Sequence, residues 1–431
     1  MSTNLSVEFG VHLDGAPLTD RFVDRPLEIQ QLRERLVPRS DDIRRRVVVV
    51  HGEAGVGKSQ LSIEFVRRYA TDFSSVFWVD GTTEESLTWR IATLQRHLKG
   101  HEFSPEAQLY TRSSAHLRRA VVGLLRWFSI KENNRWLLII DGLMTEALSS
   151  DDDVQTVKLE SFLPTADQGS VLITTRSVQE GHKYDYALKL ETLGIEQAES
   201  LIAEKNRKQW QVRCDRVKDG GRYVAYSSIE LGPPDQIKES LNLLEKSPIA
   251  IKQAGAFIRE TKSTISGYLQ RYKSALGQLR QLGCVLETPL DTPPKEPVLV
   301  TTTISYDHIS TEAETAAKFL KLWTYLDNRD LWYQLFTPDD ALLAQSESLW
   351  WFRWAIRTPE GFEKAMHTLK AYGMIQSKEN SSGYFLHPVI HECDVWTISK
   401  DKDPEFAWLA VRTVGRVTPS GSSEDELCLK Q

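Results

Sequence analysis

The sequence predicts a doubly wound α/β domain over residues 21–190, and three observations support this fold class. Apolar runs occur at residues 47–50, 76–80, 136–141 and 169–176, and the first of them is entirely β-branched. They lack the alternation of half-exposed strands, which is typical of parallel strands buried on both faces. Segments with helical periodicity separate them, and a glycine-rich loop joins the first run to a helix.

The first helix is expected just after residue 24. Asp24 can cap it and Pro26 fits its first turn. Ile29, Leu32 and Leu36 then fall on one face at helical spacing. This segment therefore predicts an amphipathic helix that packs on the sheet.

Two more helices are expected between the second and third strands. Residues 82–98 begin with capping-box spacing, Thr82 to Glu85, and predict a helix. A second helix follows, with an apolar face that includes Leu117 and Leu124. Beyond residue 190 the predicted character is helical, so the sheet should end there.

The composition fits a multi-domain protein of the cell interior. At roughly 150 residues per domain, 431 residues correspond to two to four domains. Lys plus Arg number 53 and Asp plus Glu 59, and this net charge of −6 argues against a chain that coats nucleic acid or anionic membrane. Four cysteines without a pairing pattern favour a reducing compartment. Neither a signal-peptide layout nor a membrane-length apolar run occurs, so we expect a cytoplasmic protein without a membrane segment.

The strongest chemical signal is the phosphate loop at residues 52–59, Gly-Glu-Ala-Gly-Val-Gly-Lys-Ser. It lies between a predicted strand and a helix, which is the context that a G-x-x-x-x-G-K-S motif requires. The glycines let the backbone curl so that its N–H groups point at phosphate oxygens, and the helix adds its positive N-terminal end. Lys58 supplies a cation for the β- and γ-phosphates and Ser59 a hydroxyl for Mg²⁺.

Two polar residues follow other strands of the predicted sheet. Asp141 ends the strand at 136–141, at the edge where α/β sheets bind ligands, and can hold Mg²⁺ directly or through water. Arg176 ends the strand at 169–176 and is placed to sense a γ-phosphate. The alternatives are a turn-forming aspartate and a solvent-facing arginine.

Six segments, in order, resemble the motifs of the NB-ARC branch of the STAND nucleotide-binding switch proteins, the central modules of plant and fungal NOD-like immune receptors. They are the entry motif at 22–25 (Phe-Val-Asp-Arg), the phosphate loop at 52–59, the Walker B strand at 137–141, the sensor strand at 169–176, the Gly-Leu-Pro-Leu motif at 247–255 and the Met-His-Asp segment at 384–391 in its His-Pro form. The His-Pro form and the phrase Trp-Val-Asp at 78–80 favour a fungal relative.

The resemblance implies an organisation for the whole chain. The α/β domain would be a P-loop NTPase domain, followed by a helical domain and a winged-helix domain. The implied boundaries are 1–20 for a lead-in, 21–190 for the nucleotide-binding domain, 191–290 for the helical domain with a polar insertion at about 211–234, 298–396 for the winged helix and 397–431 for a tail. A proline-rich linker at 288–297 would separate the last two domains.

It also implies a bound ADP or ATP with Mg²⁺. The entry motif would lie against the adenine, Pro248 would pack on the base, and His387 would touch the β-phosphate of ADP. The residues assigned to the nucleotide are Phe22, Val23, Arg25, Gly52, Ala54, Gly55, Val56, Gly57, Lys58, Ser59, Gln60, Pro248 and His387. Ser59 and Asp141 are assigned to Mg²⁺, and Asp141, Glu146 and Arg176 to catalysis.

Three positions depart from the family pattern. Gly142 stands where a second acidic or amide residue usually follows the Walker B aspartate, which leaves Glu146 as the candidate to activate water. The proline motif has Lys246 or Ser247 in place of its leading glycine, and Pro388 replaces the aspartate after His387. The first departure argues against rapid hydrolysis.

The favoured hypothesis is a switch in which ADP holds a closed monomer and exchange for ATP permits homo-oligomerisation, with effector and sensor partners that the sequence does not name. The alternative is an enzyme, a Mg-dependent ATPase that hydrolyses ATP through many turnovers. A DNA-binding winged helix is a third, but its main helix offers only Lys364 and Lys370, so no nucleic-acid partner is expected. His387, His391 and Cys393 lack the further cysteines of a typical zinc site.

Overall fold

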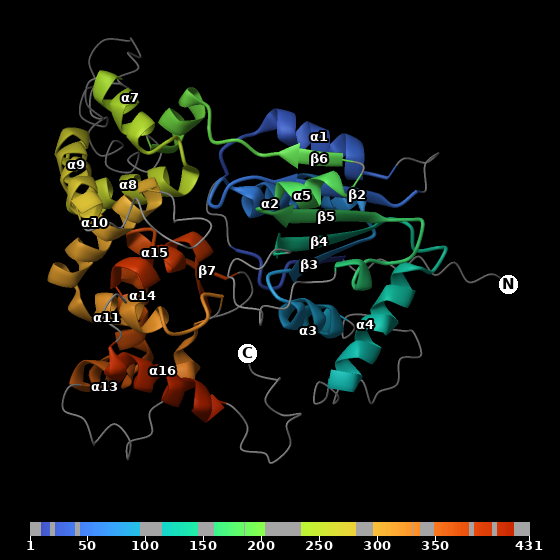
Figure 1. The fold of residues 1–431 in the computed structure, drawn as a ribbon. Coiled ribbons are helices and arrows are strands. Elements are labelled where there is room, and N and C mark those ends of the chain that lie inside the picture. Colours follow the sequence, from blue (N-terminus) through green and yellow to red (C-terminus); the bar gives the residue numbers. More distant parts are fainter. Residues whose placement is uncertain are drawn as a thin grey trace, which may run out of the picture. The chain divides into compact units, whose positions relative to one another are not determined.

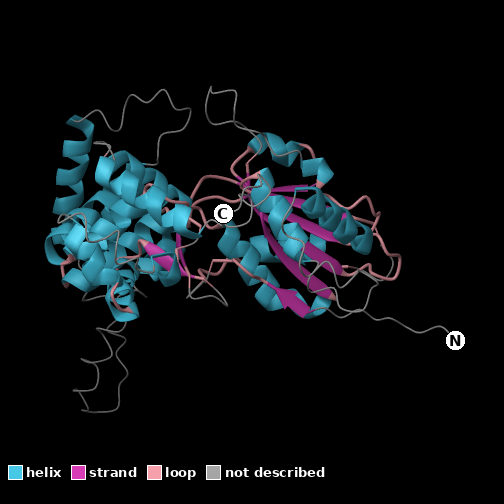
Figure 2. Cartoon of the chain, turned by 90° about the horizontal axis from the view of Figure 1, so that it is seen from below, coloured by secondary structure: helices cyan, strands magenta, loops and turns pink. Residues whose placement is uncertain are grey.

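The structure is a computed structural model that describes residues 10–17, 22–38, 44–94, 114–144, 159–184, 186–202, 234–281, 296–329, 331–336, 349–378, 383–398 and 403–417. Its contacts divide the chain into two compact units, built mainly on Met1–Glu191 and on Thr192–Lys378 with Ser382–Val414. Figure 2 shows the long strands gathered in the first unit, whereas the second is almost entirely helical. Each unit is described by itself below.

The first unit contains a six-stranded sheet in the order β1-β3-β4-β5-β2-β6 (Figure 1). The strands are β1 (Gly10–His12), β2 (Arg46–His51), β3 (Ser75–Asp80), β4 (Trp136–Leu143), β5 (Ser170–Thr175) and β6 (Tyr186–Lys189). All neighbours pair in parallel, which confirms the predicted parallel α/β sheet. The short strands β1 and β6 were not predicted, because three or four residues carry too little periodicity to be recognised.

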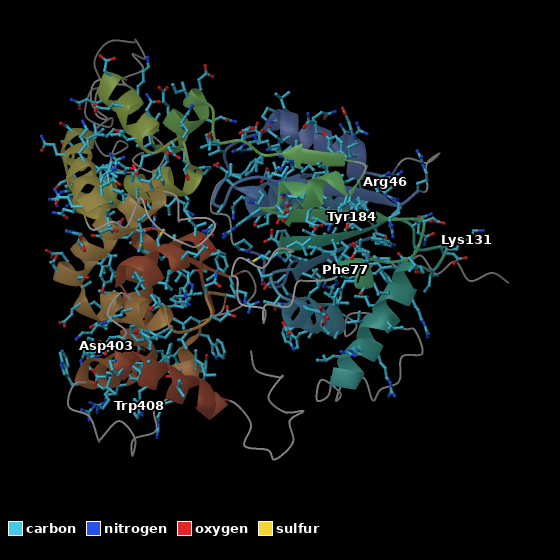
Figure 3. All side chains as sticks on the ribbon, viewed as in Figure 1. Arg46, Phe77, Lys131, Tyr184, Asp403 and Trp408 are labelled. Carbon is cyan, nitrogen blue, oxygen red and sulfur yellow. The ribbon has the colours of Figure 1, made fainter. Side chains whose placement is uncertain are left out.

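Helices cover both faces of this sheet (Figure 1). On one face α1 (Pro26–Leu36) and α2 (Lys58–Tyr69) pack their apolar residues with alternate strand residues such as Val48 and Val50. On the other, α3 (Glu84–Leu94) and α4 (Ser114–Phe128) enclose Val49 and Phe77. Figure 3 labels Phe77, whose ring meets Trp127 and Phe128 edge-on. This two-faced burial explains the unbroken apolar strands of the sequence.

Two expected helix caps are wrong by one residue. Arg25, not Asp24, is the N-cap of α1, and Asp24 instead accepts a hydrogen bond from Arg68 at 2.9 Å. Thr83, not Thr82, caps α3, since its Oγ1 accepts from Ser86 N at 3.0 Å. Pro26 lies in the first turn of α1 as predicted. Residues 95–98 of the predicted helix lie outside the described residues.

The second unit is helical. It contains a helix at residues 195–202, α7 (Pro234–Leu243), α8 (Pro248–Thr261), α9 (Ile265–Gln281), α10 (Glu296–Glu312), α11 (Glu314–Trp323), α13 (Trp350–Ile356), α14 (Pro359–Ala371), α15 (Pro388–Ile398), α16 (Pro404–Val417) and the antiparallel pair β7 (Ile375–Ser377) and β8 (Tyr384–Leu386). Five of these helices begin at a proline, the residue that fits the first helical position because it needs no hydrogen-bond acceptor there.

Some sequence boundaries shift in the structure. Helix α10 begins at Glu296, inside the linker predicted at 288–297, and carries Pro297 in its first turn. Helix α16 lies within the residues assigned to the tail, and Asp403 at its start accepts a hydrogen bond from Lys321 at 2.8 Å (Figure 3). The insertion predicted at 211–234 falls almost wholly outside the described residues. In the part of the chain that the structure describes, no helix has the length and apolar character to cross a membrane.

Candidate functional site

The phosphate loop joins β2 to α2, as predicted, and its glycines adopt backbone conformations that other residues avoid. Gly52, Gly55 and Gly57 have φ values of 146°, 77° and 104°. At Gly52 space is also short, because a Cβ would lie 2.6 Å from the carbonyl oxygen of Leu190. Val56 is buried, so its side chain anchors the loop in the core while the backbone stays free to curl.

Lys58 stands at the first residue of α2. Its Nζ donates hydrogen bonds to the carbonyl oxygens of Gly52 and Glu53, both at 2.8 Å. The pKa of Lys58 is lowered to about 8, chiefly by burial and next by the positive charge of Arg176, while the charge of Asp141 opposes both. The ammonium is therefore held under the loop, where negative phosphate oxygens would stabilise its charge.

Ser59, Asp141 and Thr174 form a chain of short hydrogen bonds across three elements. Asp141 Oδ1 accepts from Ser59 Oγ at 2.8 Å and from Thr174 Oγ1 at 2.6 Å. Thr174 Oγ1 in turn accepts from the backbone N–H of Gly142 at 2.8 Å. Because β4 and β5 are neighbours and β5 adjoins β2, residues far apart in sequence meet at one edge of the sheet.

The Asp141 carboxyl is sensitive to this environment. Burial raises its pKa above the ordinary value, the hydrogen bonds from Thr174 and Ser59 lower it, and the charge of Asp80 raises it. A hydroxyl and a carboxylate oxygen 2.8 Å apart are hard oxygen donors of the kind that Mg²⁺ prefers, and a divalent cation would favour the ionised carboxylate. The donor set therefore fits magnesium.

Two residues of this edge were missed by the sequence analysis. Thr174 was passed over in favour of its neighbour Arg176, although a hydroxyl in a buried strand that ends beside the loop is a usable signal. Asp80 ends β3 in register with Asp141. Its oxygens accept from Thr82 and Ser86, so Asp80 organises the turn into α3 and acts on Asp141 through its charge.

Gly142 has a structural reason to be glycine. Its φ is 75°, in the left-handed region, and the pairing of β4 with β5 is irregular between Ile140 and Leu143. An acidic side chain at this position would be strained. Glu146, the candidate for water activation, lies outside the described residues.

The entry motif contributes mostly by shaping the loop. Arg25 is buried, and its Nη1 and Nη2 donate to the carbonyl oxygens of Glu191 at 3.0 Å and Val56 at 3.3 Å. It thus ties the start of α1 to the phosphate loop and to the chain after β6. Phe22 packs against the core on the α1 and α2 face, and Val23 is half-buried.

Pro248 and His387 lie in the second unit, each at the start of a helix. Pro248 is the half-exposed first residue of α8. The two residues before Ser247, Glu245 and Lys246, have φ values of 48° and 53°, so Lys246 occupies a left-handed position that favours glycine.

His387 immediately precedes α15. Its Nδ1 accepts a hydrogen bond from Val389 N at 3.2 Å, so in the neutral ring the proton resides on Nε2, the atom that could donate to a phosphate. Burial lowers the pKa of His391, one turn later, whose Nε2 is 3.2 Å from the Trp323 carbonyl oxygen. Among the described residues, no group of three or more His, Cys, Asp or Glu side chains could hold a metal ion.

The family model of the NB-ARC domain matches residues 26–210, from the first residue of α1 through every strand from β2 to β6. The chain contains an NB-ARC domain. This nucleotide-binding module includes the phosphate loop, Asp141 and Thr174, and the match confirms the family to which the sequence motifs pointed.

One curated relative is a nucleotide-binding leucine-rich repeat (NLR)-like protein from Hyaloscypha variabilis. It is 24% identical over 445 residues, which cover 99% of this chain and 39% of the relative. The chain thus spans about two fifths of the length of that relative.

Similar solved structures include a signal transduction ATPase with numerous domains (STAND) protein with a tetratricopeptide repeat sensor from Pyrococcus horikoshii. Its TM-score is 0.48 at 17% identity, and the match covers 94% of this chain and 47% of that one. The ORC2 protein of Aeropyrum pernix has a TM-score of 0.35 at 12% identity over 89% of this chain and 98% of its own.

Proposed function

We propose that the chain is the ADP/ATP-dependent conformational switch of a STAND or NLR-type signalling protein. ADP would hold a closed monomer, and exchange for ATP would permit oligomerisation. The observation that carries the proposal is the assembled constellation of Lys58, Ser59, Asp141 and Thr174 inside an NB-ARC domain.

Each residue has a proposed task. The loop N–H groups and Lys58 bind the phosphates, and Ser59 with Asp141 holds Mg²⁺, which would neutralise phosphate charge. Arg176, whose charge already acts on Lys58, senses the γ-phosphate. Pro248 packs on the adenine and His387 donates from Nε2 to the β-phosphate of ADP.

For the second unit we also propose the two domains expected from the sequence. Helices α7 to α9 supply a helical domain, and α10 to α15 a winged helix. Helix α14 followed by the antiparallel pair β7 and β8 has the helix-and-wing order of such a domain. A cytoplasmic location is part of the same proposal.

The backbone at Gly142 favours a switch over a turnover ATPase. The position that usually carries a second acidic residue has left-handed backbone geometry. The carboxylate of the nearby Asp80 accepts hydrogen bonds from the turn into α3 and is therefore a poor base for activating water. A switch needs nucleotide affinities that differ between two states and does not need rapid hydrolysis.

The test combines light scattering with phosphate release on the purified chain. The switch predicts a monomer with ADP, a larger species with a non-hydrolysable ATP analogue, and at most one phosphate released per chain from ATP. Multiple-turnover release without a change in mass would instead establish the ATPase. Lys58→Arg should remove the response to nucleotide.

A further inference from the structure

A buried polar cluster lies in the helical core of the second unit. The amide of Gln253, on α8, is 0% exposed, and Thr301 and Thr302, on α10, are 1% and 0% exposed. Gln253 Oε1 accepts from Thr301 Oγ1 at 2.6 Å, and Gln253 Nε2 donates to Thr302 Oγ1 at 3.1 Å. A buried amide is costly unless it is paired, so this pairing fixes α8 against α10 in one register.

The same face of α8 also holds the end of α14 and the turn into β7. Gln253 Nε2 reaches Met374 Sδ at 3.5 Å, and Arg259 Nη2 donates to the Ala371 carbonyl oxygen at 2.8 Å. Between them, a Cβ built on Gly373 would lie 3.6 Å from the Cβ of Ala256. Gln253, Ala256 and Arg259 are three positions apart and therefore lie on one stripe of α8. This stripe supports the corner formed by the end of α14 and the turn into β7.

The antiparallel pair β7 and β8 connects this corner to His387. Met374 precedes β7, whose Ile375 pairs with Leu386 of β8, and His387 is the next residue. Asn328 holds the end of β8 from the other side, since Leu386 N donates to the Asn328 carbonyl oxygen at 2.9 Å and Asn328 Nδ2 donates to the Leu386 carbonyl oxygen at 3.0 Å. A continuous set of contacts therefore joins α8, which begins at Pro248, to the backbone that carries His387.

We infer that Gln253 is a positioning residue that sets where His387 stands relative to Pro248, and so how tightly the chain holds ADP. The inference rests on the proposed function, in which these two residues contact the base and the β-phosphate. Directional hydrogen bonds suit this task, because an apolar contact of equal volume holds two helices together without specifying their register.

The experiment measures ADP and ATP affinities of the full chain with fluorescent nucleotides. Gln253→Met keeps the volume of the side chain and removes its hydrogen bonds. We expect ADP affinity to fall about tenfold with ATP affinity unchanged, a coupling of ordinary size for sites linked through a protein interior. In a His387→Ala background the same substitution should have no further effect, because Gln253 acts through His387.

Two variants separate positioning from stability. The triple variant Gln253→Met, Thr301→Val, Thr302→Val also removes the two buried hydroxyls that lose their amide partner, although Thr301 Oγ1 keeps a second acceptor in the Val298 carbonyl oxygen at 3.0 Å. Its melting temperature should therefore return towards that of the wild type while its ADP affinity stays low. Tyr272→Phe removes a hydrogen bond to the Leu243 carbonyl oxygen in the same unit, away from the corner. It should lower the melting temperature without changing the preference for ADP.

The outcomes separate the inference from the proposed function. Equal losses of ADP and ATP affinity in Gln253→Met, or effects that add to those of His387→Ala, would overturn the inference alone. An inert His387→Ala would overturn both the phosphate contact and the inference.

Discussion

The two units position their candidate residues by different means, around the phosphate loop in the first unit and at Pro248 and His387 in the second. Around the loop, the polar side chains touch one another, with Asp141 2.8 Å from Ser59 and 2.6 Å from Thr174. In the second unit Pro248 is the first residue of α8, His387 immediately precedes α15, and we infer that the buried Gln253 cluster positions their backbone. The first arrangement should fail when local geometry is disturbed, and the second when distant packing is disturbed.

The largest expected effect is at Gly52. In Gly52→Ala the new Cβ would lie 2.6 Å from the Leu190 carbonyl oxygen at a φ of 146°. We expect the free energy of unfolding to fall by about 2–3 kcal/mol and nucleotide retention to be lost. Urea denaturation and the nucleotide content of the purified variant measure both.

A glycine of the second unit supplies the matched control. Gly277, on an exposed face of α9, has open space around its Cβ position. Gly277→Ala should stabilise the chain by about 1 kcal/mol through helix propensity and leave nucleotide binding unchanged. Equal behaviour of the two alanine variants would show that the loop is not spatially constrained.

Thr174→Val tests whether the loop site depends on direct side-chain contact. The variant keeps the shape of the side chain but removes the hydrogen bonds to Asp141 and from Gly142. Affinity for Mg-nucleotide should fall about tenfold, the size expected for one hydrogen bond to a charged group. Binding with EDTA present should change little.

The neighbouring threonine is the control for that experiment. Thr175 Oγ1 donates a hydrogen bond to the Leu143 carbonyl oxygen at 2.8 Å, instead of to Asp141 as Thr174 does. Thr175→Val should reduce stability without altering magnesium dependence. If both variants respond to magnesium alike, Thr174 has no special role.

A pair of buried carboxyls, one in each unit, sharpens the comparison. Asp141 accepts two hydrogen bonds, whereas neither oxygen of Asp394, on α15, has a hydrogen-bond partner among the described residues. Burial raises the pKa of Asp394 well above its ordinary value. The folded chain therefore binds a proton that the unfolded chain releases near pH 4.

That proton gives the stability a pH dependence of known sign. The contribution of Asp394 to the free energy of unfolding is fully present below the pKa that this group has in the unfolded chain. It is lost as the pH rises towards the higher pKa of the folded chain. Asp394→Asn removes this slope, so its free energy of unfolding relative to the wild type should increase as the pH is raised above 4, measured by urea denaturation. Parallel curves for the two proteins would show that Asp394 is ionised or solvated in the folded state.

The smallest expected effect is at Lys246, where φ is 53°. Lys246→Gly relieves left-handed strain and should raise the free energy of unfolding by up to about 1 kcal/mol, since the added flexibility of the unfolded chain offsets part of the gain. Lys246→Ala retains a Cβ and should show no gain. A stabilised alanine variant would point to the lysine charge as the cause.

The sequence predicted most of the sheet and the loop because both signals are local. Strand β2, the glycine motif and the apolar face of α2 are contiguous, and Asp141 directly follows a buried run. The short strands β1 and β6 carry too few residues for such a pattern. The Gln253 cluster could not be predicted, since its partners are 48, 49 and 121 residues away and threonine and methionine carry no motif.

The nucleotide released when the purified chain is denatured tests the central claim most directly. The switch predicts stoichiometric ADP from the wild type and none from Lys58→Arg, whose bulkier guanidinium cannot reproduce the position of Nζ against Gly52 and Glu53. A guanine nucleotide, an empty wild type, or ADP retained by Lys58→Arg would contradict it.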